Sequence, residues 1–339
     1  VDTINESTTG SGVTVDGVLI KDGSVKGNGT GRKNAIINGN FDIWQRGTSF
    51  TATGYTADRW NAIVSGTGTT TISQQSFTLG QTDVPNEPKY YLRVAKSSGA
   101  ASGDYLSSKN ENVRTFAGQA TVISFYAKAS ASTTLTPTVR QNFGTGGSPS
   151  SVNDVVKSDI SVTTSWQKFT ITHTFDSISG KTLGSNGNDH IELFFNIQNG
   201  AGDSVDFAQF QWEKGSVATD FEVRLIGEEL SLCQRYYYKT FVQSQAPAQN
   251  ISPGRTVVLN YTGAGSGATG FSFPQVMRAT PTMTFYNPYA ANSSFRQWNS
   301  SNDYTPSSVE VDEVQIKTYY FNGVNITGGH INFVADAEL

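Results

Sequence analysis

Apolar residues from Lys33 onward recur in short runs separated by Gly, Ser, Asn and Pro, a spacing that is typical of strands joined by turns. The dense runs at 121–126 and 191–197 predict central strands, whereas the alternation at 167–172 predicts a strand with one solvent-facing side. The predicted strands up to residue 226 are 35–37, 59–64, 69–74, 90–95, 120–127, 135–143, 167–175, 190–198 and 205–214. Short strands at this spacing predict an all-β fold with a jelly-roll sandwich over residues 35–226.

The strand pattern is interrupted over residues 227–250. Leu230, Cys233 and Tyr237 are spaced along one face of a helix, and Glu228 and Glu229 suit its first turn, so 227–238 is predicted to be a short linker helix. A connector rich in Gln, Ala and Pro follows it. Strand patterns then resume at 256–261, 270–273, 282–286, 310–321 and 330–335, which predicts a C-terminal β-sandwich over residues 251–339.

Residues 1–34 alternate apolar and polar positions around Val13, Val15, Val18 and Ile20, with Asp-Gly turn dipeptides between them. This segment has too little apolar surface to fold as a monomer. Three identical chains wound together would bury each stripe and leave no strand edge unpaired, so a short intertwined trimeric β stalk is predicted. The alternative is a flexible linker.

The amino-acid composition excludes several classes of partner. Charged residues make up 15% of the chain, aromatic residues 12%, and the net charge is -4 without a basic cluster, so no nucleic-acid partner is expected. No stretch is long and apolar enough for membrane insertion, and no cleavable signal peptide is visible. The single Cys233 excludes an intramolecular disulfide framework, which favours stability through core burial or oligomerisation.

Several motifs resemble those of bacteriophage tail-fibre or virion-fibre proteins. They are INGNFDIWQRG at 37–47, YTADRW at 55–60, FQWEKGS at 210–216 with ATDFE at 218–222, and LCQRYY at 232–237. The opening VDTINESTTGSGVTVDGVLIKDG and the ending FVADAEL are similar to the corresponding parts of phage structural proteins. The central module is also similar to jelly-roll carbohydrate-binding modules. The resemblance implies a homotrimeric fibre whose head recognises a host-surface glycan or another receptor, and whose N-terminal segment contacts other virion proteins.

In such carbohydrate-binding modules a structural calcium is commonly held by an early acidic residue and a late strand, which implies Asp42 and Asp206 here. Calcium needs several oxygen ligands at once, and the sequence shows only scattered carboxylates, so turn caps or surface charges are the preferred interpretation and no metal or cofactor is predicted. Asp58 and Arg59 are interpreted as a paired acid and base that close one end of the sandwich.

The candidate ligand-binding residues are aromatic, because a flat ring covers the apolar face of a sugar while polar neighbours bind its hydroxyls. Trp60 and Trp212 lie inside strand patterns and are predicted to be buried. Trp166 and Trp298 lie among polar loop residues and are the preferred ligand-facing tryptophans. The second candidate patch, at the distal tip of the C-terminal domain, contains Tyr286, Tyr289, Phe295 and Arg296.

No enzyme is predicted. The tripeptide 202–204, Gly-Asp-Ser, matches a short esterase signature but lacks a preceding buried strand and a following Asp-x-x-His, so a turn is the preferred interpretation. His173, His190 and His330 are too dispersed in sequence to indicate a metal cluster or a triad. On the resemblance to phage fibre proteins, the chain is predicted to be an adhesive virion fibre. The alternatives are a non-adhesive structural or decorating component of the particle, and a glycan depolymerase.

Overall fold

The computed structural model describes residues 32–65, 68–99, 104–197, 200–258, 270–298, 301–306, 308–320 and 328–339, together with three short strands between residues 13 and 26. These three strands are β1 (Val13–Val15), β2 (Val18–Lys21) and β3 (Ser24–Lys26), and they form one antiparallel sheet in the order β1-β2-β3. The two predicted Asp-Gly turns between them lie outside the described residues. Winding of this segment into a trimer stays a prediction.

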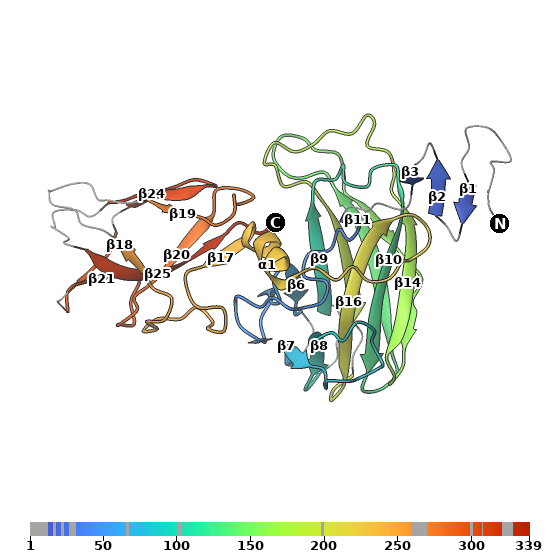
Figure 1. Ribbon diagram of the computed structural model, residues 1–339, viewed down its shortest axis with the longest axis horizontal. Helices are drawn as coiled ribbons and strands as arrows, with labels where there is room; N and C mark the ends of the chain where they lie inside the picture. The colour runs from blue at the N-terminus through green and yellow to red at the C-terminus, as the bar shows by residue number, and fades with distance from the viewer. Residues whose placement is uncertain are drawn as a thin grey trace.

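The larger part of the protein is a sandwich of two antiparallel sheets (Figure 1). The first sheet has the order β14-β10-β16-β8-β7-β4, with β14 Gln167–Thr174, β10 Ala120–Ala129, β16 Ser204–Lys214, β8 Tyr90–Lys96, β7 Thr70–Ser76 and β4 Ser49–Phe50. The second sheet has the order β12-β11-β15-β9-β6-β5, and β13 also pairs with β11. Its strands are β12 Asn153–Val156, β11 Thr133–Asn142, β15 His190–Ile197, β9 Asp104–Glu111, β6 Trp60–Ile63, β5 Gly54–Tyr55 and β13 Ile160–Val162. From β8 to β16 the chain passes repeatedly between the two sheets, which is the connectivity of a jelly roll and confirms the predicted all-β sandwich.

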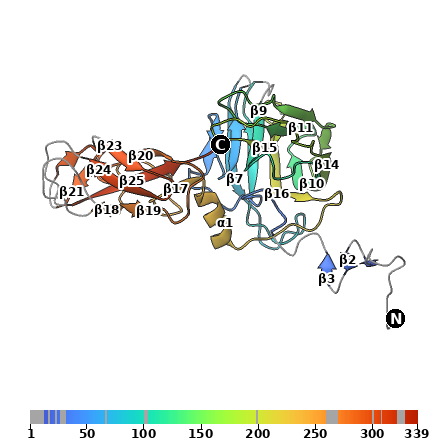
Figure 2. The ribbon, with the colours of Figure 1, turned by 90° about the horizontal axis from the view of Figure 1, so that it is seen from above.

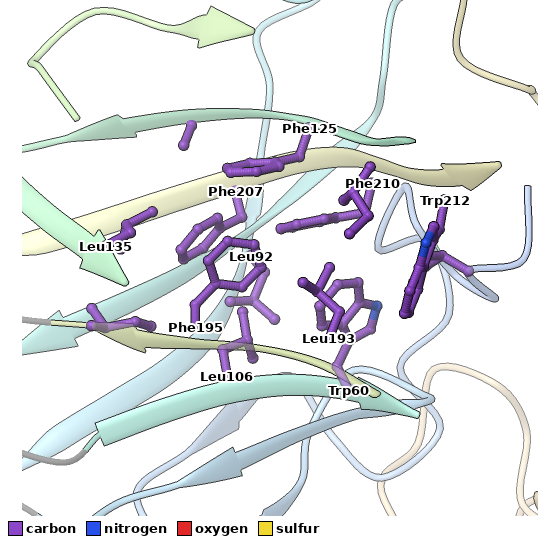
Figure 3. Close-up of a cluster of buried hydrophobic side chains, with 14 of the residues drawn as sticks. Trp60, Leu92, Leu106, Phe125, Leu135, Leu193, Phe195, Phe207, Phe210 and Trp212 are labelled. Atoms are coloured by element: carbon purple, nitrogen blue, oxygen red, sulfur yellow. The ribbon is translucent and has the colours of Figure 1, made fainter. Parts of the chain in front are cut away.

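Aromatic side chains from both sheets fill the sandwich core (Figure 3). Phe125 on β10 stacks on Phe210 of β16 with ring centroids 4.8 Å apart, and Phe195 of β15 meets Phe125 edge-on at 5.1 Å. Trp60 and Trp212 are fully buried, as predicted. Because successive strand residues face opposite sides, the neighbours of these core residues along each strand point away from the core and build the outer faces.

One predicted strand is absent from the structure, and several strands, of which β9 is the longest, were not predicted. Residues 35–37 form no strand, because Ala35 makes one backbone bond to the carbonyl of Trp212, 2.8 Å away, and the chain then turns. Strand β9 was not predicted, since its polar Ser107, Ser108 and Asn110 hide the strand pattern although all three are buried between neighbours. Tertiary pairing with β6 and β15 overrides the weak local preference here.

The C-terminal part is built around β25 (Gly329–Asp336). This strand pairs with β17 (Tyr237–Lys239), β18 (Thr256–Val258), β20 (Thr282–Tyr286) and β21 (Phe295–Gln297), and β21 also pairs with β22 (Asp303–Tyr304). A second sheet has the order β19-β24-β23, from β19 Phe271–Ser272, β24 Gln315–Tyr320 and β23 Ser308–Val311. The predicted strand pattern at 310–321 is thus the hairpin β23–β24.

Helix α1 (Ile226–Gln234) joins the two parts, and Figures 1 and 2 both place it with the C-terminus at their junction. Glu228 and Glu229 lie in its first turn and Cys233 is buried, as the helix pattern predicts. The inclusion of Tyr237 in the helix was wrong, because the helix ends at Gln234 and Tyr237 pairs with Asp336 in the sheet. Among the described residues no helix is long and apolar enough to cross a membrane.

Charged residues of the sandwich hold the C-terminal end of the chain. Arg46 contacts carboxylate oxygens of Asp336 and Glu338 at 3.2 Å each, and Arg59 donates to the other Glu338 oxygen. The Arg59 guanidinium lies 3.4 Å from the ring centroid of Tyr236. Asp58 and Arg59 therefore take different partners and do not form the predicted pair.

The buried Asp58 is satisfied by Gln45, whose backbone and side-chain amides donate to it at 2.9 and 2.5 Å. The same Gln45 side chain donates to the carbonyl of Tyr237 at 2.7 Å, so it connects the sandwich to β17. Lys239 donates back to the carbonyl of Gln45 at 2.8 Å, and burial lowers the pKa of Lys239 to about 8. The motif at 37–47 thus connects the sandwich to the C-terminal part through hydrogen bonds.

Candidate functional site

Trp166 lies just before β14, and its ring meets two aromatic side chains from distant segments. The centroid of Phe77, which follows β7, is 5.3 Å away, and that of Tyr91 on β8 is 5.5 Å away. Phe77 and Tyr91 are themselves 4.8 Å apart. All three side chains are half-buried. Leu92 on the same strand as Tyr91 points into the core, so this cluster covers the outer face of the first sheet.

Cationic side chains border the aromatic cluster. Arg93 makes two hydrogen bonds to Asp206, at 2.7 and 2.8 Å, and Lys128 lies 3.9 Å from the same carboxylate. The Lys128 ammonium is 5.2 Å from the centroid of Trp166. The Asp206 side chain is almost fully buried, whereas about a third of the Arg93 and Lys128 side chains is exposed. We call Phe77, Tyr91, Arg93, Lys128 and Trp166 the outer-sheet platform.

The platform combines apolar ring surface with hydrogen-bond donors. Burial and, to a lesser extent, the Asp206 carboxylate raise the pKa of Tyr91, so its hydroxyl stays protonated and able to donate. Asp206 fixes the guanidinium of Arg93 and raises its pKa. Partly exposed rings beside fixed donors can pack against the C–H face of a sugar ring and bind its hydroxyl groups.

Only some of the candidate binding residues predicted for the distal tip lie close together. Tyr289, Arg296 and Trp298 gather around His330: the His330 ring lies 6.0 Å from Tyr289 and 5.9 Å from Trp298, and Arg296 lies 5.7 Å from the Tyr289 centroid. Arg255 reaches the same tyrosine at 5.8 Å. Arg296 is paired with Asp303, and the hydrogen bond from Arg296 lowers the pKa of the Asp303 carboxyl to about 2. We call Tyr289, Arg255, Arg296, Trp298 and His330 the distal patch.

Two predicted binding residues lie elsewhere. Phe295 is fully buried, with its ring 5.1 Å from Tyr319, so it belongs to the core of the C-terminal part and is not open to a ligand. Phe295 and Arg296 are consecutive residues of β21, and consecutive strand residues face opposite sides of the sheet. Tyr286 packs edge-on against Phe241 at 5.4 Å and is not among the distal-patch contacts.

Sequence reasoning missed four residues around Trp166, namely Phe77, Tyr91, Arg93 and Lys128, and two around Tyr289, namely His330 and Arg255. The strand alternation at 90–95 does place Tyr91 and Arg93 on the face opposite Leu92, so part of the platform was accessible from the pattern. The approach of Trp166 and Phe77 depends on how the loop before β14 folds over the sheet. Nothing in the local sequence indicates that approach.

The two carboxyl groups considered for a metal accept hydrogen bonds from neighbouring side chains. Both oxygens of Asp206 accept hydrogen bonds from Arg93, and Asp42 accepts one from Asn40 at 2.9 Å. Across the described part of the chain, no three His, Cys, Asp or Glu side chains are grouped so that they could hold a metal ion. In the tripeptide 202–204, Asp203 accepts hydrogen bonds from Ser130 and Lys96 in a turn that leads into β16.

Comparisons with known proteins give no family. No family model matches the sequence, and a search of curated proteins finds no match. Among solved structures, the enzymatically active domain of tailspike protein 4 from bacteriophage CBA120 aligns at 12% identity and a TM-score of 0.36, covering 54% of this chain and 21% of that one. The chain thus spans about a fifth of the length of that tailspike chain.

Two other similar structures are smaller. A putative sugar-binding protein from Bacteroides thetaiotaomicron aligns at 13% identity with a TM-score of 0.37, covering 54% of this chain and all of its own. The CBM22-1 xylan-binding domain of Xyn10C from Paenibacillus barcinonensis aligns at 17% identity with a TM-score of 0.31, covering 50% of this chain and 94% of its own.

Proposed function

We propose that this chain is a fibre protein of a tailed bacterial virus and that it binds a glycan on the host-cell surface through the outer-sheet platform. The observation that carries the proposal is the cluster of Phe77, Tyr91 and Trp166 on a solvent-facing sheet, with the partly exposed Arg93 and Lys128 at its border.

The rest of the proposal concerns assembly. The N-terminal segment attaches to other virion proteins and brings three chains together, and each trimer presents three equivalent platforms. Such sites can be individually weak, because linking them makes the second and third binding events intramolecular and raises the overall avidity. The role is adhesive and not enzymatic, and the site of action is the virion surface.

The decisive experiment measures binding of the purified chain to host cells and to a glycan array, for the native protein and for Trp166→Ala. We expect the substitution to weaken the affinity of the platform for glycan about 5- to 150-fold, since stacking on an aromatic ring contributes on the order of 1–3 kcal/mol. Tyr289→Ala in the distal patch is the matched control and should bind like the native protein.

Three results would contradict the proposal. Loss of binding in Tyr289→Ala alone would move the site to the distal patch. No binding to cells or glycans would favour a structural or decorating component of the particle. Release of reducing ends from host polysaccharide would indicate a depolymerase.

A further inference from the structure

A cavity of about 760 Å³ lies where the sandwich meets α1 and the connector that follows β17. Its size falls in the range of small-molecule sites, roughly 300–1,000 Å³. We call it the junction cavity, and it is lined by residues of the motif at 37–47, of the loop before β8, of α1 and of the connector after β17. None of these residues belongs to the outer-sheet platform.

One wall offers hydrogen-bonding groups. Asn40 donates its side-chain amide to Asp42 at 2.9 Å, while its own buried carbonyl oxygen Oδ1 has no hydrogen-bond partner in the part of the chain that the structure describes. That oxygen has almost no accessible surface, so the hydrogen-bonding groups open to the cavity are the side chains of Asp42, Asn86, Glu87 and Lys89, which also line it. Asp42 is mostly buried, and that burial raises the pKa of its carboxyl group.

The loop facing this wall is held in an unusual backbone conformation. Asn86 and Glu87 have φ angles of +65° and +46°, which side-chain-bearing residues adopt rarely and which cluster at functional sites. Gln209 donates to the carbonyl of Pro85 at 2.6 Å and so ties the loop to β16. Asn86 and Glu87 both line the cavity, and the Glu87 carboxylate accepts a hydrogen bond from the backbone amide of Gly80 at 3.2 Å.

Another part of the lining is apolar. Val223 and Ile226 are 63% and 61% exposed although they border a cavity, and Leu230 lies one helical turn beyond Ile226. Tyr90 adds an aromatic ring, with the Lys89 ammonium 4.9 Å from its centroid. Hydroxyl-binding groups in one part of the lining and an aliphatic and aromatic surface in another match the two kinds of surface that a pyranose presents.

The charges favour a neutral ligand. Two carboxyl groups, Asp42 and Glu87, and one ammonium group, Lys89, line the cavity, so an acidic sugar would meet an excess of like charge. We propose that the junction cavity is a second saccharide site, which binds the end of a neutral oligosaccharide. This inference rests on the proposed function, and it makes each chain bivalent, with one site on the outer sheet and one beside α1.

The test uses isothermal titration of the full chain with four neutral oligosaccharides: cellotetraose, xylotetraose, maltotetraose and galactotriose. Ile226→Trp is designed to fill the cavity from an exposed position where a larger side chain does not disturb a core. Leu225→Trp is the matched control, because Leu225 is 80% exposed and lies beside Ile226 but outside the cavity wall. Trp166→Ala removes the platform, and far-ultraviolet circular dichroism checks that each variant is folded.

We expect two equivalents bound per native chain and per Leu225→Trp chain, and one per chain for Ile226→Trp and for Trp166→Ala. One equivalent in the native protein, lost in Trp166→Ala and unchanged in Ile226→Trp, would overturn the second site and leave the proposed function standing. Absence of binding in all four proteins would overturn the second site, whereas the proposed function would still be decided by binding to host cells and to the glycan array. A change of molar mass in light scattering for Ile226→Trp would identify the cavity rim as a contact between copies and would also overturn the inference.

Discussion

The carboxylate of Glu338 offers a sharp test of how the two parts of the protein are joined. It accepts from Arg59, whose side chain is 1% exposed, and from Arg46 at 3.2 Å. In Glu338→Gln the side chain keeps its shape but loses its charge. Arg46 still has Asp336 at 3.2 Å, whereas Arg59 keeps the Lys109 carbonyl, the Tyr236 ring and a longer-range attraction to Glu111.

A buried charge without its partner destabilises a protein by about 3–5 kcal/mol. Because the amide retains a hydrogen-bond acceptor, we expect a loss near the lower end, about 3 kcal/mol in the free energy of unfolding. With a urea m value of about 3 kcal/mol/M, this loss moves the unfolding midpoint down by roughly 1 M. The measurement is equilibrium urea unfolding followed by tryptophan fluorescence, since Trp44 and Trp60 lie in the same motifs as the two arginines.

The matched control is Glu228→Gln in α1. Glu228 pairs with Arg32 at 2.7 Å, but the two side chains are 33% and 59% exposed, so this pair contributes less than about 1 kcal/mol. If Glu338→Gln shifts the midpoint no further than Glu228→Gln does, the junction does not depend on the Arg59–Glu338 pair and the reasoning is refuted.

Two further predictions concern the sandwich. Gly39→Ala should prevent stable folding or lower the free energy of unfolding by more than about 3 kcal/mol, because a Cβ at this position would lie 2.1 Å from the carbonyl oxygen of Phe210. In the control Gly227→Ala the added Cβ meets no atom within 4 Å, so stability should stay unchanged or rise by about 0.5–1 kcal/mol. Equal thermal midpoints for the two variants would contradict this prediction. Burial lowers the pKa of His173 from 6.5 to about 4, so the unfolded chain takes up a proton before the folded one and stability falls as pH drops from about 6.5 to about 4. His173→Gln should weaken that acid dependence in thermal unfolding, and an unchanged pH profile would show that His173 does not contribute to it.

Local patterns were sufficient for the strands with regular alternation. The strand predicted at 282–286 is β20, and the one predicted at 205–214 differs from β16 by a single residue. Strand β9 was not predicted because its buried positions hold serine and asparagine, which are polar and therefore do not produce the apolar pattern of a buried strand. The Trp60 and Trp212 prediction succeeded because large aromatic residues inside strands are usually buried.

The candidate site was harder to predict than the fold, because it depends on contacts between segments far apart in the chain. Trp166 was singled out from its polar loop, but Phe77 and Tyr91 lie more than seventy residues earlier. Arg59 appeared beside Asp58 in sequence, yet its carboxylate partner is Glu338, 279 residues away. Residue type indicated the kind of chemistry in each case, and only the fold supplied the partner.

Strand β25 has a consequence for how the protein is made. All four strands that pair with it, β17, β18, β20 and β21, precede it in the chain, so during synthesis they remain without their central neighbour until residues 329–336 emerge. The sandwich, whose last strand ends at Lys214, can fold well before that moment. The waiting strands have exposed edges that can pair with another copy, so the interval before β25 is inserted is the stage at which nascent chains are most prone to misassemble.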